Sequence, residues 1–211
     1  MTPHVTIKTP STYTRLRVVE VDGEPVRTTS KAVLRELSLT DGEIPDVSVL
    51  VRQIDDCEPT IAMQRALTLL SYRERTRPEV LQSLADDGYP ENLARAVCDR
   101  LEESGLLDED RFVEVYIRTK HSAGWGSRRI RQGLNRAGVD PGRVDLALTD
   151  AGEADYERAL RYAQRRSPRC QRDIQKVAAA LSRRGFDPEI AWRAAREASV
   201  DSPDDLDAST C

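Results

Sequence analysis

Residue types that carry out catalysis are scarce in this chain of 211 residues. Only two histidines occur, His4 in a terminus expected to be frayed and His121 at an expected helix end. The phosphate loop G-x-x-x-x-G-K-[ST], the zinc motif H-E-x-x-H and the nucleophile motif G-x-S-x-G are all missing. Gly124-Trp125-Gly126 is part of a glycine-rich phosphate loop at most, because a preceding strand and a third glycine are lacking. We therefore expect a helix connection there and no enzyme activity.

Metal and cofactor chemistry has equally little support. The cysteines are widely spaced, with no C-x-x-C pair and no nearby histidine pair; they are Cys57, Cys98, Cys170 and Cys211. Adjacent carboxylates such as Asp86-Asp87 diverge on a helix surface instead of converging on one ion. The sequence predicts no metal, no cofactor and no small-molecule substrate.

Basic side chains supply the chemistry that the sequence does offer. Residues 111–200 contain 19 Lys and Arg against 11 Asp and Glu, a net charge of +8, whereas residues 1–110 carry −8. Such a density suits phosphates or an acidic protein surface, and the alternative is a helical face that is merely solvated. The candidate binding residues are Arg118, Lys120, Arg128, Arg129, Arg131, Arg136, Arg165, Arg166, Arg172, Lys176, Arg183 and Arg184.

A pattern that recurs three times predicts the helices that carry these cations. It consists of an aliphatic residue, Leu four positions later, Gly four positions after that, and then an apolar residue. The copies are Val80-x3-Leu84-x3-Gly88-Tyr89, Ile130-x3-Leu134-x3-Gly138-Val139 and Val177-x3-Leu181-x3-Gly185-Phe186. The spacing places Val and Leu on one helix face, and Gly is typical of a helix C-terminus. With glycines 50 and 47 residues apart, the pattern predicts tandem units, and such units usually present a binding surface.

The expected fold is mainly α: three three-helix repeats in a curved, elongated array, preceded by a small β-containing module. The first module should contain a hairpin, because Thr14–Val21 alternates, Asp22-Gly23 suits a tight turn and Val26–Thr29 returns. Ser30 should then cap a short helix over Lys31–Leu37, while Val47–Ile54 fits strand or helix. Further N-caps are expected at Thr60 and Ser127, and Asp140-Pro141 and Asp187-Pro188 should each open a helix. The predicted division is 1–58 for the module, 59–107, 108–152 and 153–200 for the repeats, and 201–211 for an acidic disordered tail.

Composition limits where the protein acts. No run approaches the roughly 18 consecutive apolar residues of a membrane span. Residues 1–11 lack a basic segment followed by an apolar stretch, so we expect no secretion signal, no membrane partner and a cytoplasmic location.

The order and spacing of these residues resemble the RecX family of bacterial recombination regulators, from about residue 60 to residue 200. The third repeat matches less distinctively, and Val113 stands where such proteins often carry Ala. The stretches that carry the resemblance are Ala66-Leu67-x-x-Leu70, Arg77-Pro78-Glu79-Val80, Leu101-x3-Gly105-Leu106-Leu107-Asp108-x-Asp110-Arg111-Phe112 and Gly124-x-Gly126-x-x-Arg129-Ile130. The resemblance implies a protein without enzyme activity that lies in the groove of the RecA–DNA filament and restrains ATP hydrolysis and strand exchange.

Three functions therefore stand side by side. The resemblance predicts a modulator, expected to be an inhibitor, whose partners are the RecA nucleoprotein filament and single- or double-stranded DNA. A helical protein that binds DNA directly, without RecA, is the second, and its mark is steep salt dependence on naked DNA. A plain helical scaffold is the third, and it predicts neither interaction.

Overall fold

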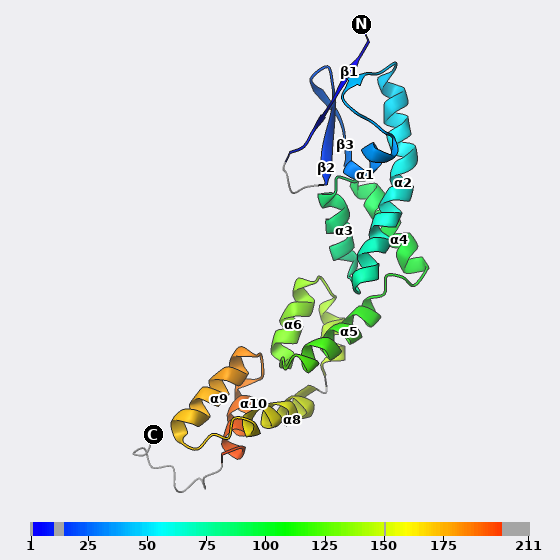
Figure 1. The fold of residues 1–211 in the computed structure, drawn as a ribbon. Helices are drawn as coiled ribbons and strands as arrows, with labels where there is room; N and C mark the ends of the chain where they lie inside the picture. The colour runs from blue at the N-terminus through cyan, green and yellow to red at the C-terminus, as the bar shows by residue number, and fades with distance from the viewer. Residues whose placement is uncertain (1, 11–14, 150, 200–211) are drawn as a thin grey trace. The chain divides into compact units, whose positions relative to one another are not determined.

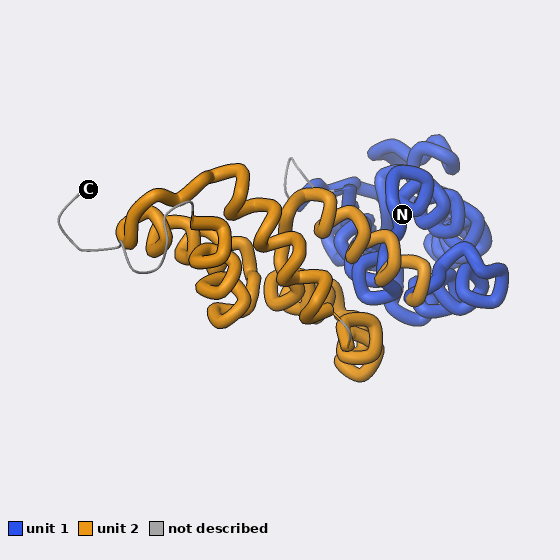
Figure 2. Tube along the Cα trace, turned by 90° about the horizontal axis from the view of Figure 1, so that it is seen from below, with its two compact units in different colours: residues 1–109 blue, residues 110–211 orange. Residues whose placement is uncertain are grey.

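A computed structural model describes residues 2–10, 15–149 and 151–199 of the chain. The chain divides into two compact units, Met1–Glu109 and Asp110–Cys211, which Figure 2 distinguishes by colour. Within the described residues, the first unit combines a β-sheet with four helices, and the second contains helices but no strand. Figure 1 shows the elements of each unit. The predicted tail, residues 201–211, lies outside the described residues.

The first unit opens with a four-stranded antiparallel sheet of strand order β3-β2-β1-β4. Its strands are β1 (His4–Lys8), β2 (Leu16–Val21), β3 (Glu24–Ser30) and β4 (Gly42–Glu43). The predicted hairpin is confirmed, because β2 and β3 pair across Asp22 and Gly23, which have φ angles of 52° and 89°. The expectation of a frayed terminus at His4 is wrong. His4 begins β1, which pairs with both β2 and β4.

Helices α1 (Lys31–Glu36) and α2 (Val47–Tyr72) connect the sheet to the repeats. Ser30 caps α1 as predicted, because its side chain accepts a hydrogen bond from the Val33 backbone N–H. The expected N-cap at Thr60 is wrong. Asp46 caps a helix of 26 residues that continues through Pro59, so Val47–Ile54 is helical and the predicted boundary at residue 58 falls inside α2.

The remaining helices complete three triplets, with α2 as the first helix of the first triplet. The first triplet adds α3 (Arg77–Asp86) and α4 (Glu91–Glu103). The second consists of α5 (Glu109–Ser122), α6 (Ser127–Arg136) and α7 (Pro141–Ala147), and the third of α8 (Ala151–Gln164), α9 (Gln171–Arg183) and α10 (Pro188–Glu197). The predicted helix starts at Asp140-Pro141 and Asp187-Pro188 are confirmed, and each Asp is the N-cap with Pro in the first turn. The expectation of tandem three-helix repeats is therefore confirmed.

The recurring Gly pattern ends the middle helix of each triplet in the same way. Gly88, Gly138 and Gly185 have φ angles of 96°, 79° and 89°, a left-handed conformation that glycine adopts without steric cost. The next residue then turns back, and its N–H donates to the carbonyl of the Leu five positions earlier, at 3.1–3.2 Å. This is the hydrogen bond of a Schellman motif, and it buries the side chains of Tyr89, Val139 and Phe186.

The sheet and the first triplet share one hydrophobic core. That core extends from Val5 in β1 to Leu107 after α4. Polar contacts join the same parts: Ser30 Oγ donates to Tyr89 Oη at 2.8 Å, and Thr29 Oγ1 donates to the buried Glu58 carboxylate at 2.5 Å. In the second unit, the second and third triplets each have a core of their own.

Candidate functional site: a basic groove in the second unit

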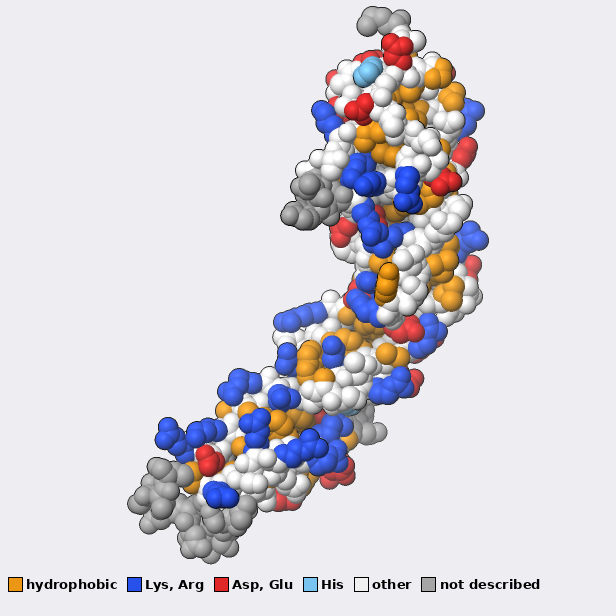
Figure 3. All heavy atoms as spheres, in the orientation of Figure 1, with side chains coloured by type: hydrophobic (Ala, Val, Ile, Leu, Met, Phe, Trp, Pro, Cys, Tyr) orange, Lys and Arg blue, Asp and Glu red, His pale blue; other side chains and the backbone are white. Residues whose placement is uncertain are grey.

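Four arginines line a groove between α6 and the C-terminal end of α9. Its volume is about 510 Å³, and the lining residues are Arg128, Arg129, Arg131, Gln132, Asn135, Ser182, Arg183 and Gly185. None of these eight described residues is acidic. In the view of Figure 3, Lys and Arg side chains gather over the part of the molecule that contains α6 and α9. We call this feature the basic groove.

The orientation of α6 explains why its arginines line the groove. Ile130 and Leu134 are fully buried in the core of the second triplet, as predicted. Because these two residues fix which face of α6 is inside, the residues at 128, 131, 132 and 135 project from the opposite side. A cationic surface on a ten-residue helix is the result.

Backbone contacts join the two sides of the groove directly. The N–H of Gly126 donates to the Arg184 carbonyl, and the N–H of Arg128 donates to the Gly185 carbonyl, each at 3.0 Å. No side chain fits between these segments. A Cβ added to Gly126 would lie 2.4 Å from the Phe186 nitrogen, and one added to Gly185 would lie 2.2 Å from the Arg129 Cβ. The width of the groove is therefore set by a glycine-to-glycine junction.

A buried carboxylate from the third triplet caps the N-terminus of α6. Ser127 was expected to be the N-cap, and this is wrong: the N-cap position is Gly126, which offers no side chain. Instead the N–H of Ser127 donates to Asp155 Oδ2 at 3.0 Å. Asp155 also pairs with Arg158 at 2.6 Å, and Arg158 lies 3.1 Å from His121 Nε2. An anion at this position stabilises the positive end of the helix dipole and fixes α6 against α8.

Two aromatic rings hold cations beside the groove. The Arg129 guanidinium lies 3.9 Å from the Trp125 ring centre, and the Lys120 ammonium lies 4.7 Å from it. Tyr162 in α8 holds Arg184 at 4.8 Å and Arg166 at 5.1 Å. Cation–π contacts restrict these long side chains without neutralising them, so their charges stay available to a ligand.

The structure separates the twelve predicted binding residues into groups. Arg128, Arg129, Arg131 and Arg183 line the basic groove, and Lys120, Arg166 and Arg184 stack on the rings beside it. Arg131 also forms an ion pair with Asp145. Others pair within their own helix, Arg118 with Glu114 and Lys176 with Asp173. The last group is exposed and does not line the groove; it consists of Arg136, Arg165 and Arg172.

Sequence reasoning did not single out the residues that shape the groove. Asp155 and the contact of Gly126 with Gly185 depend on packing between the second and third triplets, and the role of Tyr162 depends on packing between α8 and the end of α9. The glycines at 124 and 126 predicted a connection between two helices, but nothing in the local sequence indicates which residues that connection contacts. The missed residues are therefore the ones that depend on non-local contacts.

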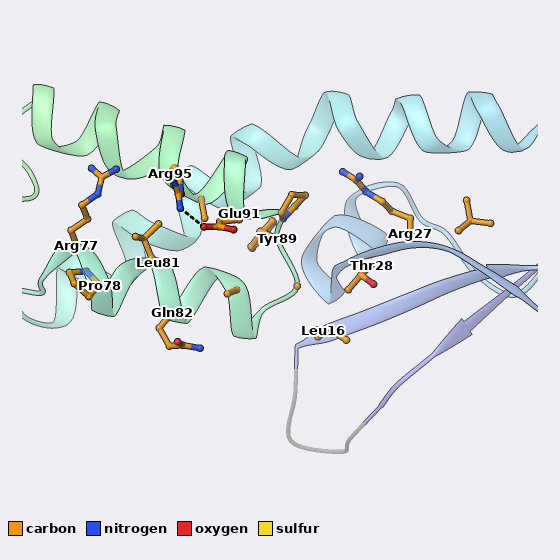
Figure 4. A pocket seen from close by; sticks show the side chains of 15 residues that line it. Leu16, Arg27, Thr28, Arg77, Pro78, Leu81, Gln82, Tyr89, Glu91 and Arg95 are labelled. Atoms are coloured by element: carbon orange, nitrogen blue, oxygen red, sulfur yellow. Dashed lines mark hydrogen bonds and ion pairs between the residues drawn. The ribbon is translucent and has the colours of Figure 1, made fainter. Parts of the chain in front are cut away.

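The corresponding face of the first triplet has different chemistry. By the repeat pattern, Pro78, Leu81, Gln82 and Ala85 of α3 correspond to Arg128, Arg131, Gln132 and Asn135 of α6. They line a hollow of about 960 Å³ together with Leu16 and Tyr89, shown in Figure 4. The arginines at its rim are already paired, Arg95 with Glu91 and Arg77 with Asp99 and Glu102. Strong positive charge on this helix face thus distinguishes α6 from α3.

Metal sites and membrane spans have no support in the described residues. Within the described ranges, no group of three or more His, Cys, Asp or Glu side chains is placed to hold a metal ion. Among the helices of the described residues, none has both the length and the apolar character needed to span a bilayer.

Three-helix units in tandem, with a cationic groove between two of them, define a helical-repeat protein. The chain matches the family descriptions "RecX, first three-helix domain" over residues 62–101 and "RecX, second three-helix domain" over residues 108–148. It is 39% identical to "Regulatory protein RecX" of Halorhodospira halophila over 141 residues, which cover 64% of this chain and 87% of that protein. The chain belongs to the RecX family of regulatory proteins.

Other comparisons agree with this assignment. "Regulatory protein RecX" of Mycolicibacterium smegmatis is 33% identical, with 60% of this chain and 73% of that protein covered. A crystal structure of regulatory protein RecX matches with a TM-score of 0.59 and 23% identity, covering 93% of this chain and all of that chain. RecX from Lactobacillus salivarius matches with a TM-score of 0.60 and 23% identity, covering 66% of this chain and 96% of the other. These solved structures share the fold.

Proposed function

We propose that this protein regulates RecA by binding the RecA–DNA filament through the basic groove, and that binding restrains ATP hydrolysis and strand exchange without any chemistry on its own part. The observation that supports this proposal is the groove between two triplets, which is lined by four arginines and by no acidic residue. Arginine forks suit carboxylates and phosphates, the two groups that a nucleoprotein filament offers. Family membership supports RecA as the partner.

The test is RecA ATP hydrolysis on single-stranded DNA, with this protein added well below the RecA concentration. The variant is Arg128→Glu/Arg183→Glu, because both side chains are exposed and line the groove. Arg131 is left unchanged, since its reversal would place two carboxylates together at Asp145. Removing two favourable charge contacts costs roughly 1–2 kcal/mol, so we expect filament affinity to fall about tenfold or more.

The matched control is Arg52→Glu/Arg100→Glu, which alters net charge by the same amount at two exposed positions of the first unit. We expect it to inhibit ATP hydrolysis as the unchanged chain does. Equal inhibition by the groove variant, with its fold confirmed by circular dichroism, would contradict the proposal.

Direct DNA binding is the alternative function. It requires tight binding to naked duplex DNA whose log K falls with log salt by about 0.9 per phosphate contacted.

A further inference from the structure

The sequence contains an acidic segment whose charge complements the basic groove. Residues 201–211 carry four aspartates and no Lys or Arg, namely Asp201, Asp204, Asp205 and Asp207. This segment lies outside the described residues, and the described chain ends just before it, at Ser199. The groove, by contrast, lies in a segment of net charge +8 and has no acidic residue in its lining. Opposite charges of this size on one chain attract each other.

The chain geometry allows the acidic segment to reach the groove. Helix α10 begins at Pro188, three residues after Gly185, which lines the groove. Its ten residues advance about 15 Å at 1.5 Å per residue, so the helix ends within that distance of its own start. The twelve residues from 200 to 211 span up to roughly 40 Å when extended. The acidic segment is therefore long enough to return along α10 to the groove and to lie across it.

We propose that residues 201–211 bind in the basic groove of the same chain and act as an autoinhibitory segment. Their carboxylates pair with Arg128 and Arg183, and they occupy the groove until an acidic partner displaces them. The regulatory part of this proposal rests on the proposed function, because it assumes that the partner uses the groove. The contact within the chain does not depend on it.

The strength of such a contact suits a segment that must be displaced. Ion pairs between exposed side chains are individually weak and are screened by salt. Tethering compensates, because a short flexible linker gives an effective concentration on the order of millimolar. A filament that offers many phosphates and carboxylates at once outcompetes the segment, whereas a scattered single anion does not.

Trp125 provides a reporter that needs no partner. The chain has two tryptophans, and Trp192 is 37% exposed, so Trp192→Phe leaves Trp125 as the only one at little cost to packing. Trp125 stacks on Arg129, which lines the groove. In the Trp192→Phe chain we compare the acidic segment as it stands with Asp201→Asn/Asp204→Asn/Asp205→Asn/Asp207→Asn. Trp125 emission is followed from about 20 mM to about 500 mM NaCl, over which the Debye length falls severalfold.

The expected result is a salt-dependent change in Trp125 emission that the four-Asn chain lacks, and that is independent of protein concentration. A peptide of residues 201–210 added to the four-Asn chain should restore the low-salt emission. Identical salt curves for the two chains would overturn the proposal. A difference that grows with protein concentration would also overturn it, since the segment would then occupy the groove of a second copy.

Filament binding then separates this proposal from the proposed function. We expect the four-Asn chain to inhibit RecA at a concentration roughly threefold to tenfold lower, and to lose that gain when Arg128→Glu/Arg183→Glu is added. If the emission curves coincide while the groove variant still weakens filament binding, the autoinhibitory contact fails and the proposed function stands. If the curves differ while no chain affects RecA, the contact stands and the proposed function fails.

Discussion

Two glycines determine how closely the second and third triplets pack. Gly126 and Gly185 face each other where the start of α6 meets the turn after α9, and each position lacks room for a Cβ. Glycine is required at the two positions for different reasons. Both lack space for a Cβ, but only Gly185 also has a positive φ, of 89°, whereas Gly126 has an ordinary φ of −84°. Gly126 therefore tests the close approach alone, without backbone strain.

We expect Gly126→Ala to destabilise the second unit by roughly 1–3 kcal/mol, the usual cost of forcing an extra methyl into a packed site. The new Cβ would lie 2.4–2.5 Å from backbone atoms of Gly185 and Phe186, which cannot move aside as a flexible side chain would. Urea unfolding followed by far-ultraviolet circular dichroism measures the change. The Gly126→Ala substitution should also widen the groove and weaken binding of the acidic segment.

Gly152→Ala is the matched control for this substitution. Gly152 lies in α8, and a Cβ added there would meet nothing within 4 Å. Because alanine has a higher helix propensity than glycine, we expect no loss of stability, and the free energy of unfolding should rise by up to about 1 kcal/mol. Equal stability of the two variants would contradict the idea that the junction depends on the absence of a side chain.

At the scale of elements, α5 and α8 meet through a polar cluster that gives the second unit a pH response. His121 in the last turn of α5 lies 3.1 Å from the Arg158 guanidinium, and Arg158 pairs with the buried Asp155. Burial lowers the pKa of His121 below its ordinary value of 6.5, and the positive charge of Arg158 lowers it further, while Asp155 opposes both. A neutral ring accepts a hydrogen bond from Arg158, and a protonated ring does not.

The sign of the effect on stability follows from this lowered pKa. Between the folded pKa of His121 and 6.5, the unfolded chain binds more protons than the folded chain, so stability falls as the pH is lowered through that window. We expect His121→Gln to remove this slope, since glutamine keeps an acceptor but does not titrate. Urea unfolding of both chains at several pH values measures it. His4→Gln should keep the slope of the unchanged chain, and loss of the slope in that control would contradict the assignment to His121.

The helices of the triplets could be predicted from sequence because the residues that define each helix lie within a short segment. Val80, Leu84 and Gly88 carry both the buried face and the stop signal within nine residues. Helix α2 shows the limit of the same reasoning. A helix start was expected at Thr60, yet Leu50 and Ile54 before it and Ala62 after it are buried in one core, so packing carries the helix through Pro59.

The sequence predicts the positive charge of the site but not which residues line the groove. The excess of arginine in residues 111–200 and the outward face of α6 follow from composition and from the burial of Ile130 and Leu134. Which arginines share the groove depends on Gly126 meeting Gly185, 59 residues later, and on Asp155 reaching Ser127. Strands β1 and β4 escaped prediction for the same reason, since each is short and defined by its partners.

Across the whole molecule, the sheet and the first triplet are interdependent. Helix α2 contacts α1, α3, α4 and β3, and it passes through residue 58 without a break. Glu58 is 1% exposed, and its carboxylate accepts hydrogen bonds from Thr29 Oγ1 and from Arg27. A buried carboxylate of this kind is costly unless its partners from the sheet are present. The division at residue 58 thus runs through a shared helix and a shared core.

We expect a fragment of residues 1–107 to fold cooperatively and a fragment of residues 59–107 to remain unfolded. The shorter fragment loses the first twelve residues of α2 and every sheet residue that shares a core with Leu84 and Tyr89. A chain of its length cannot bury enough apolar surface to offset its conformational entropy. Circular dichroism and urea titration of both fragments measure the difference. The fragment of residues 110–199 serves as the comparison, because its two triplets have cores of their own and should unfold cooperatively without the sheet. A sigmoidal urea transition in the fragment 59–107 would show that the first triplet is self-sufficient, and the sheet would then be an attachment instead of half of a core.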